Sequence, residues 1–177
     1  RARIDSSGRV GIGTSSPSEV LDLRSTGTTR IFLESNDGGS PEYRATVGVD
    51  SNGFKIQTRD GTFGSITDRL TIDTSGNVGI GVTSPGNYDS EANQLVIASG
   101  TDDAGITIVT GSNVGSHGSI FFADGTTGGA TKKGQIRYEQ NNEVMSFWTN
   151  ENERCRIDAS GRLLVGTSSA PSGSTVL

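Results

Sequence analysis

One phrase of about fifteen residues occurs three times in this chain, and no other feature of the sequence limits the fold as strongly. The copies read "RIDSSGRVGIGTSSP" from Arg3 to Pro17, "TIDTSGNVGIGVTSP" from Thr71 to Pro85, and "RIDASGRLLVGTSSAP" from Arg156 to Pro171. In each copy, apolar residues alternate with other residues on both sides of an Asp-x-x-Gly tetrapeptide. That period of two is typical of strands with one buried face. Each copy therefore predicts a β-hairpin, which the closing Pro ends.

The Asp and Gly of each phrase have the properties that a tight turn needs. An Asp carboxylate at the first turn position can accept the backbone N–H two residues further on. Gly at the fourth position can adopt a positive φ and form a bulge. We therefore predict six structural turn residues: Asp5, Gly8, Asp73, Gly76, Asp158 and Gly161.

Two features set the third copy apart. Leu164 stands where the earlier copies have Gly11 and Gly79, and Ala170 is an extra residue before the last Pro. The third unit is therefore predicted to pack differently on its outer face.

The intervals between the phrases also resemble one another. "LDLRS" after Pro17 is echoed by "LVIAS" after Pro85, and "TRIFLES" is echoed by "GITIVTG". Each interval then has a second hairpin, with turns predicted at 50–53 and near 140–142. The sequence divides into the end of a first repeat (1–17), a second repeat (18–85), a third repeat (86–171) and the start of a next segment (172–177). No stretch shows a helical period, so the predicted fold class is all-β.

A single copy of the phrase has too few apolar side chains to be stable alone. Fixing the backbone of about 15 residues costs ~15–30 kcal/mol, whereas four or five buried apolar side chains contribute ~1.5–3 kcal/mol each. Gly accounts for 26 of the 177 residues, about twice its usual share of ~7%. We therefore expect oligomerisation along a shared axis, with each phrase forming one layer.

The third repeat carries a resemblance to a known family. "NERCRIDASGRLLVGTSS", preceded by "GQIRYEQNNEVMSFWTN", resembles the repeat units of tail fibres of tailed bacteriophages, especially marine and cyanobacterial phages, which read roughly "ERMRIDSSGNVGIGTTSP". All three phrases match this pattern, and the first interval matches less closely because "GTFG" lengthens the approach to Ile72. The resemblance implies an elongated parallel homotrimer of hairpin units, a β-prism or intertwined β-fibre.

The same resemblance implies a role and partners. The chain would be a structural virion component of the phage tail, outside the cell, that contributes to host attachment. Its partners would be two further copies of itself, other tail proteins and a host surface receptor, for which a glycan is one candidate.

Charge and composition argue against other classes of protein. The net charge is −5, and without a basic patch nucleic-acid binding is not expected. No apolar stretch approaches 18 residues, so we expect no membrane insertion. The one cysteine, Cys155, cannot form an internal disulfide; it occupies the place of Ala2 and Leu70, so we expect it to be buried. The chain starts within a repeat and without Met, so we expect it to be a piece of a longer polypeptide.

No catalytic, cofactor or metal site is predicted. "GIGTSSP" lacks the Lys-Ser/Thr of a phosphate loop, and His117 is the only histidine. Two functional alternatives remain open. One is a tailspike-type polysaccharide depolymerase, for which the carboxylates Asp102, Asp103, Glu139, Glu143, Glu151 and Glu153 would be candidates. The other is a glycan-binding module that uses the loops 86–93 and 124–134; aromatic residues for core packing or sugar stacking are Phe121, Phe122, Tyr138, Phe147 and Trp148.

Three arginines, Arg1, Arg69 and Arg154, each stand four residues before a turn aspartate. In a strand this spacing covers ~13 Å, too far for a pair within the strand. Two interpretations follow. Each Arg reaches a carboxylate or carbonyl on a neighbouring strand of another chain, or each is solvated on the outer face.

Overall fold

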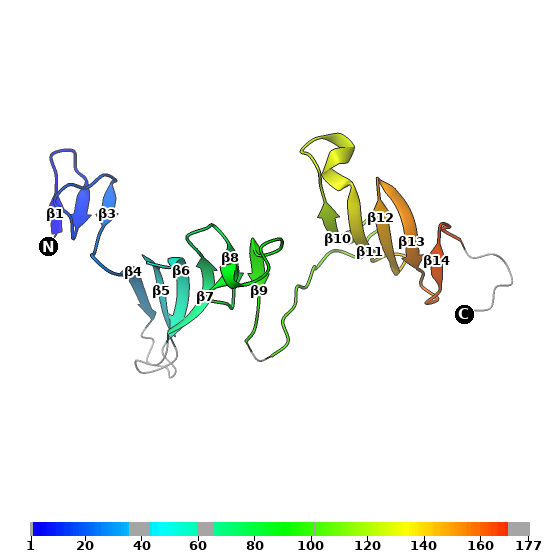
Figure 1. Ribbon diagram of the computed structural model, residues 1–177, viewed down its shortest axis with the longest axis horizontal. Coiled ribbons are helices and arrows are strands. Elements are labelled where there is room, and N and C mark those ends of the chain that lie inside the picture. Colours follow the sequence, from blue (N-terminus) through cyan, green and yellow to red (C-terminus); the bar gives the residue numbers. More distant parts are fainter. Residues whose placement is uncertain (1, 36–42, 60–65, 101, 170–177) are drawn as a thin grey trace. The chain divides into compact units, whose positions relative to one another are not determined.

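The computed structural model describes residues 2–35, 43–59, 66–100 and 102–169. It confirms that the chain is all-β, with three open sheets (Figure 1). The predicted positions Arg1, Ala170 and Pro171 and the segment 172–177 lie outside the described residues. The chain divides into two compact units, 1–105 and 106–177, and each is described by itself.

The first unit contains two sheets. In the first sheet the order is β1 (Ala2–Ile4), β2 (Val10–Ile12) and β3 (Leu21–Leu23). In the second sheet the order is β4 (Thr29–Ser35), β5 (Tyr43–Asp50), β6 (Gly53–Arg59), β7 (Ile66–Ile72), β8 (Val78–Ile80) and β9 (Leu95–Ile97). A short 3-10 helix, η1 (Pro85–Asn87), lies between β8 and β9.

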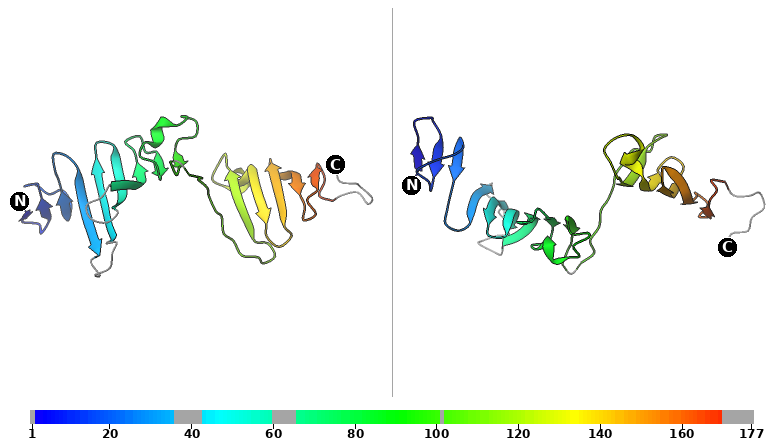
Figure 2. Two further views of the ribbon diagram at one scale, coloured as in Figure 1. Left: turned by 90° about the horizontal axis from the view of Figure 1, so that it is seen from below. Right: turned by 45° about the horizontal axis from the view of Figure 1, so that its top comes forward.

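The second unit contains one sheet of five strands and a second 3-10 helix, η2 (Gly128–Lys132). The strands are β10 (His117–Phe122), β11 (Gly134–Glu139), β12 (Val144–Thr149), β13 (Asn152–Ile157) and β14 (Leu163–Val165), in that order across the sheet. Each sheet in both units is a single layer of strands (Figures 1 and 2).

The three copies of the phrase form three equivalent antiparallel hairpins: β1–β2, β7–β8 and β13–β14. After the first two hairpins the chain crosses over and adds a parallel strand, so that Val10 stands opposite Leu21 and Val78 opposite Leu95. Pro17 and Pro85 therefore end repeats of the sequence but do not end sheets, since each sheet gains one more strand after them.

The second hairpins form as predicted, since β5 pairs with β6 and β11 with β12 around the expected turns.

The echo between "TRIFLES" and "GITIVTG" does not extend to structure. β4 is a strand, but residues 105–111 form none. Instead β10 pairs with β11 through six registered residue pairs, in the place that β4 has beside β5. The apolar alternation of 105–111 therefore remains without a partner strand in the described part of the chain.

Candidate interaction surface

The second sheet has one face that is apolar across all six strands. In-register neighbours on this face include Ile31 with Val47, Ile56 with Leu70, and Ile80 with Ile97. Because alternate residues of a strand point to opposite faces, one side collects Ile31, Leu33, Val47, Val49, Phe54, Ile56, Leu70, Ile72, Val78, Ile80, Leu95 and Ile97. Many of these side chains are exposed, for example 47% for Ile31, 37% for Ile56 and 56% for Leu95. The face has the composition of a protein core but lies open in the single chain.

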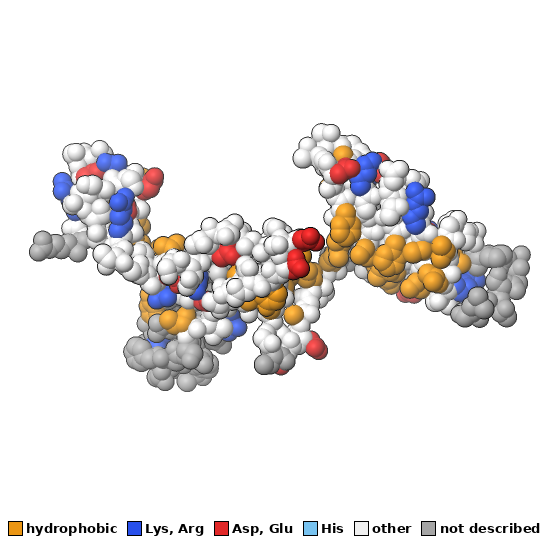
Figure 3. Space-filling model, viewed as in Figure 1, with side chains coloured by type: hydrophobic (Ala, Val, Ile, Leu, Met, Phe, Trp, Pro, Cys, Tyr) orange, Lys and Arg blue, Asp and Glu red, His pale blue; other side chains and the backbone are white. Residues whose placement is uncertain are grey.

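The sheet of the second unit has the same asymmetry. Its apolar face gathers Ile120, Phe122, Ile136, Tyr138, Met145, Phe147, Cys155, Ile157, Leu163 and Val165. Hydrophobic side chains accordingly gather over this sheet in Figure 3. Phe147 is 41% exposed and Ile157 43%. Cys155, which we expected to be buried, is only half-buried, because nothing in the single chain covers the face on which it lies.

The opposite faces are polar, and they are the better buried ones. In the second sheet Lys55 donates a hydrogen bond to Asp68 at 2.9 Å, and Gln57 donates to the same carboxylate at 2.6 Å. Lys55 and Gln57 are only 7% and 5% exposed. The buried hydrophobic residues of the described chain, Val96, Val144 and Leu164, also lie on the polar faces by register. In both of these sheets the few buried hydrophobic side chains thus lie on the side away from the apolar face.

The last residues of the second phrase cover the polar face of the second sheet at Gly79. A Cβ at Gly79 would lie 2.7 Å from the carbonyl oxygen of Val82 and 3.4 Å from Pro85. Pro85 is fully buried. Burial opposes ionisation of Asp68, but hydrogen bonds from Gln57 and Lys55 lower its pKa below the ordinary value. The polar network therefore stays ionised beneath its cover.

The three predicted turns have one geometry. The N–H of Gly8 donates to the carbonyl oxygen of Asp5 at 3.0 Å, and the Asp5 carboxylate accepts the N–H of Ser7 at 2.9 Å. The turns at Asp73 and Asp158 repeat both contacts. The positive φ predicted for the three glycines is confirmed, with values of 78° at Gly8, 88° at Gly76 and 77° at Gly161.

The side chain one residue after each turn glycine is a contact that the sequence analysis missed. Arg9 donates through Nε to the Asp5 carboxylate at 2.8 Å, and Arg162 does the same to Asp158. In the second copy Asn77 donates through Nδ2 to Asp73 at 2.9 Å. The signal was present, because the residue four positions after each Asp is a side-chain donor in all three copies.

Replacing Gly76 with Val should destabilise the protein by about 1–2 kcal/mol per chain, because a β-branched residue is strained at positive φ. A Cβ at Gly76 meets nothing within 4 Å, so this cost is conformational and not steric. Gly76→Asn is the matched control, since Asn adopts this region more readily and should lose clearly less. Urea unfolding of the two variants measures the difference, and equal stabilities would contradict the proposed role of the glycine.

The turn aspartates should make the protein sensitive to acid. A backbone hydrogen bond from Arg9 lowers the pKa of Asp5, and side-chain hydrogen bonds from Asn77 and Arg162 lower those of Asp73 and Asp158. A carboxyl whose pKa is lower in the folded state stabilises fully above its unfolded value, here 3.8, and loses this contribution as pH falls through the folded value. The melting temperature should therefore fall as the pH drops below about 4. It should fall less steeply in a triple variant that carries Asp5→Asn, Asp73→Asn and Asp158→Asn. Parallel pH profiles for the two proteins would be the contrary result.

Arg69 and Arg154 both occupy β-bulges. Ile56 pairs with Leu70 and Gln57 with Asp68, which leaves Arg69 as the extra residue of β7. Arg154 is the extra residue of β13 in the same way. Each is exposed, and each donates through Nε to a threonine hydroxyl on the adjacent strand: Arg69 to Thr58 at 2.7 Å, and Arg154 to Thr149 at 3.0 Å. The two arginines therefore contact a neighbouring strand of their own chain, and a contact with another chain remains a prediction.

If these arginines also contact another chain, an Arg69→Ala, Arg154→Ala variant should assemble less tightly, and the difference should shrink at high salt. The planar guanidinium suits bidentate contacts at interfaces. Thr58→Val with Thr149→Val is the control, since it removes the contact within the chain alone. Concentration-dependent melting at low and high salt measures the effect. Variants that assemble like the parent at both salts would rule out the inter-chain role.

The residues proposed for enzymatic or glycan-binding roles are dispersed. Residues 86–92 are exposed, and the loop 124–134 contains η2. The Glu153 carboxylate is paired with Arg156, and Nε2 of His117 lies 2.6 Å from a terminal nitrogen of Arg137. The aromatic cluster is divided between faces: Phe122, Tyr138 and Phe147 lie on the apolar face, whereas Phe121 and Trp148 lie on the polar face. Among the described residues no group of three or more His, Cys, Asp or Glu could hold a metal ion.

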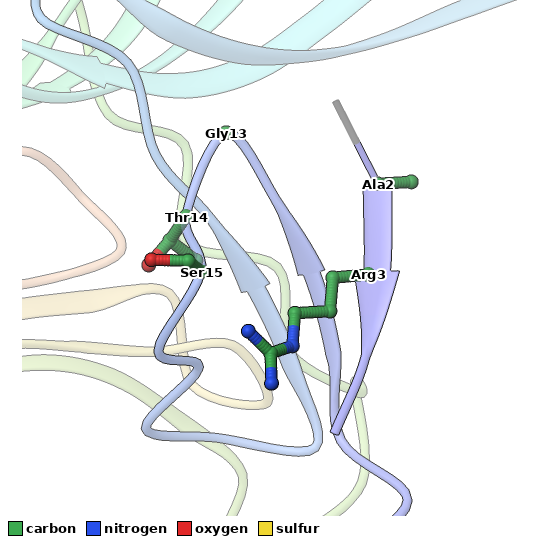
Figure 4. Close-up of a pocket in the computed structure, with 5 residues that line it drawn as sticks. All are labelled: Ala2, Arg3, Gly13, Thr14 and Ser15. Carbon is green, nitrogen blue, oxygen red and sulfur yellow. The ribbon is translucent and has the colours of Figure 1, made fainter.

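Two hollows of the described chain lie at equivalent places of the first and third phrases. One, of about 570 Å³, is lined by Ala2, Arg3, Gly13, Thr14 and Ser15; Figure 4 shows the Arg3 side chain reaching from β1 toward the segment with Thr14 and Ser15. The other, of about 380 Å³, lies on the polar face of the second unit and is lined by Trp148, Glu153, Arg156, Gly166, Thr167 and Ser168.

Comparison with known proteins gives no match to any family model, any curated protein or any solved structure. None of the helices in the described part of the chain is long and apolar enough to cross a membrane.

Proposed function

We propose that this chain is a structural segment of a homotrimeric tail fibre of a tailed bacteriophage, in the virion, where it contributes to attachment to the host surface. The observation that carries the proposal is the open apolar face of the second sheet and of the sheet in the second unit. A face of twelve aliphatic and aromatic side chains on the second sheet needs a cover of the same chemistry. Two further copies of the chain, arranged in parallel, supply that cover at every repeat.

The repeat pattern supports three chains in a parallel register. Each phrase forms the same hairpin, so one symmetric contact can recur at each copy along a common axis. The resemblance of the phrase to tail-fibre repeats supports the number three and the setting in a virion. Other tail proteins and a host receptor are the remaining proposed partners.

Labelling of phage particles tests this function. Antibodies raised against the chain should decorate fibres that extend from the tail when particles that encode the sequence are viewed by electron microscopy. Decoration of the capsid alone, or of no particle, would contradict the proposal. No enzymatic activity is proposed, so incubation with host capsule or lipopolysaccharide should release no new reducing ends; their release would favour the depolymerase alternative.

A further inference from the structure

The hollow on the second unit is built from residues that the first and third phrases share and from residues that are specific to the last repeat. Its size, about 380 Å³, falls in the range of small-ligand sites. Arg156, Gly166, Thr167 and Ser168 correspond in the phrase to Arg3, Gly13, Thr14 and Ser15, which line the hollow of the first sheet. The phrase thus twice places an arginine opposite a Gly-Thr-Ser segment.

The second copy closes the same place. There the arginine is replaced by Thr71, which is fully buried, and the Gly-Thr-Ser segment by Gly81, Val82 and Thr83. The segment lies over Gly79, and a side chain at that position would collide with Val82. In the third copy Leu164 occupies this position, opposite Arg156, and is buried. The segment after Leu164 therefore cannot approach the strand as closely as Val82 approaches Gly79 in the second copy.

Trp148 forms a fixed aromatic wall of this hollow. Its indole Nε1 donates to the Ser146 hydroxyl at 2.8 Å, and the guanidinium carbon of Arg137 lies 5.4 Å from the ring centroid. In the closed second copy, register places Gln57 at the equivalent position. A large, rigid ring beside polar groups supplies binding area with little loss of side-chain entropy.

Glu153 and Arg156 supply the polar groups. Arg156 donates to both carboxylate oxygens of Glu153, at 2.5 and 2.6 Å, and the two side chains are 16% and 24% exposed. Their charges cancel, so the pair favours a neutral ligand over an anion. Carboxylate acceptors, guanidinium donors and the hydroxyls of Thr167 and Ser168 together match a ligand whose own hydroxyls both donate and accept.

We propose that this hollow binds a neutral saccharide, with one pyranose ring against Trp148 and its hydroxyls on Glu153, Arg156 and the Thr167–Ser168 segment. A pyranose has an apolar C–H face and a rim of hydroxyls, which is the combination that the hollow presents. The site belongs to one chain and goes beyond the fibre proposal. Its ligand could be a free sugar or a residue of a surface polysaccharide.

Trp148 is the only tryptophan, so its fluorescence reports on the site directly. The full chain is titrated with methyl β-D-glucopyranoside, methyl α-D-mannopyranoside and methyl β-D-galactopyranoside. At least one should give a saturable change with a Kd on the order of 1 mM. If the Kd is at least about tenfold lower for a polysaccharide that carries the same sugar, the ligand is a surface polysaccharide. If the two affinities are equal, the ligand is the free sugar.

Glu153→Gln keeps the shape of the site but removes the charge that orients Arg156, and it should weaken binding at least about tenfold. Arg162→Gln is the matched control, because it breaks the comparable pair with Asp158 at the turn and should leave binding unchanged. A far-ultraviolet spectrum like the parent's shows that each variant is folded. The inference is overturned if no glycoside gives a saturable change up to about 50 mM, or if Glu153→Gln binds like the parent. The mass of the assembly, measured separately, tests the fibre proposal and not this site.

Discussion

Ile56→Asp should prevent assembly of the protein at micromolar concentration. Ile56 lies in β6, between Val47 and Leu70 on the apolar face, and is 37% exposed in the single chain. If other copies cover this face, they bury the remaining third or so of each Ile56 side chain, which contributes about 0.6–1.1 kcal/mol per chain, or about 2–3 kcal/mol for three chains. The substitution also places an unpaired carboxylate in an apolar interface, which adds a cost of several kcal/mol. Summed over three chains, the loss is comparable to the stability of a typical domain, ~5–15 kcal/mol.

The control for this variant is Val20→Asp. Val20 is 78% exposed and lies just before β3, outside the apolar face of the second sheet. Both variants exchange an exposed aliphatic side chain for a carboxylate, so a general effect of added charge would be the same in both. Sedimentation at equal concentration should show assembled Val20→Asp and dissociated Ile56→Asp. If Ile56→Asp assembles as Val20→Asp does, the second sheet's apolar face is not an interface.

Cys155 should react with a thiol reagent at least ~100-fold more slowly in the native protein than in the unfolded chain. In the single chain this side chain is only half-buried, beside Phe147 and Val165, and would label readily. In an assembly that covers the apolar face, labelling requires local opening, and each factor of ten in protection corresponds to about 1.4 kcal/mol of opening free energy. The single cysteine makes the readout unambiguous.

A cysteine at an exposed turn gives the comparison. In a Cys155→Ser, Ser160→Cys variant the thiol lies in the exposed turn after β13 and should label at nearly the unfolded rate. Rapid native labelling of Cys155 at concentrations where the protein is assembled would show that the face of β12–β14 stays open.

The hairpins of the repeated phrase could be predicted because their structure is local. Asp5 and Gly8 meet within one turn, and alternation fixes which residues of the adjoining strands share a face. The same logic identified Gly76 and Gly161 and both second hairpins. Leu164, noted as a departure from the earlier glycines, is buried on the polar face, and different packing of the outer face stays a prediction.

The remaining features depend on contacts between residues far apart in the sequence. Nothing near Leu21 or Leu95 indicates that these residues pair in parallel with β2 and β8 after a crossover. The bulges at Arg69 and Arg154 become visible only when the register on both sides is known. The echo of "TRIFLES" at 105–111 could not show that β11 pairs with β10 and that 105–111 forms no strand. The hollow at Trp148 needs two strands, β12 and β13, and the segment after β14, so no single stretch of sequence could reveal it.

The mass of the folded protein in solution tests the central claim most directly. One chain has a mass of 18.4 kDa. Sedimentation equilibrium, with circular dichroism of the same sample to confirm folded β-structure, should give three times that mass at micromolar concentration. The mass should fall to that of one chain only where the β-structure is also lost, because the apolar faces cannot remain uncovered in a folded state. A folded, stable species of 18.4 kDa would contradict the account.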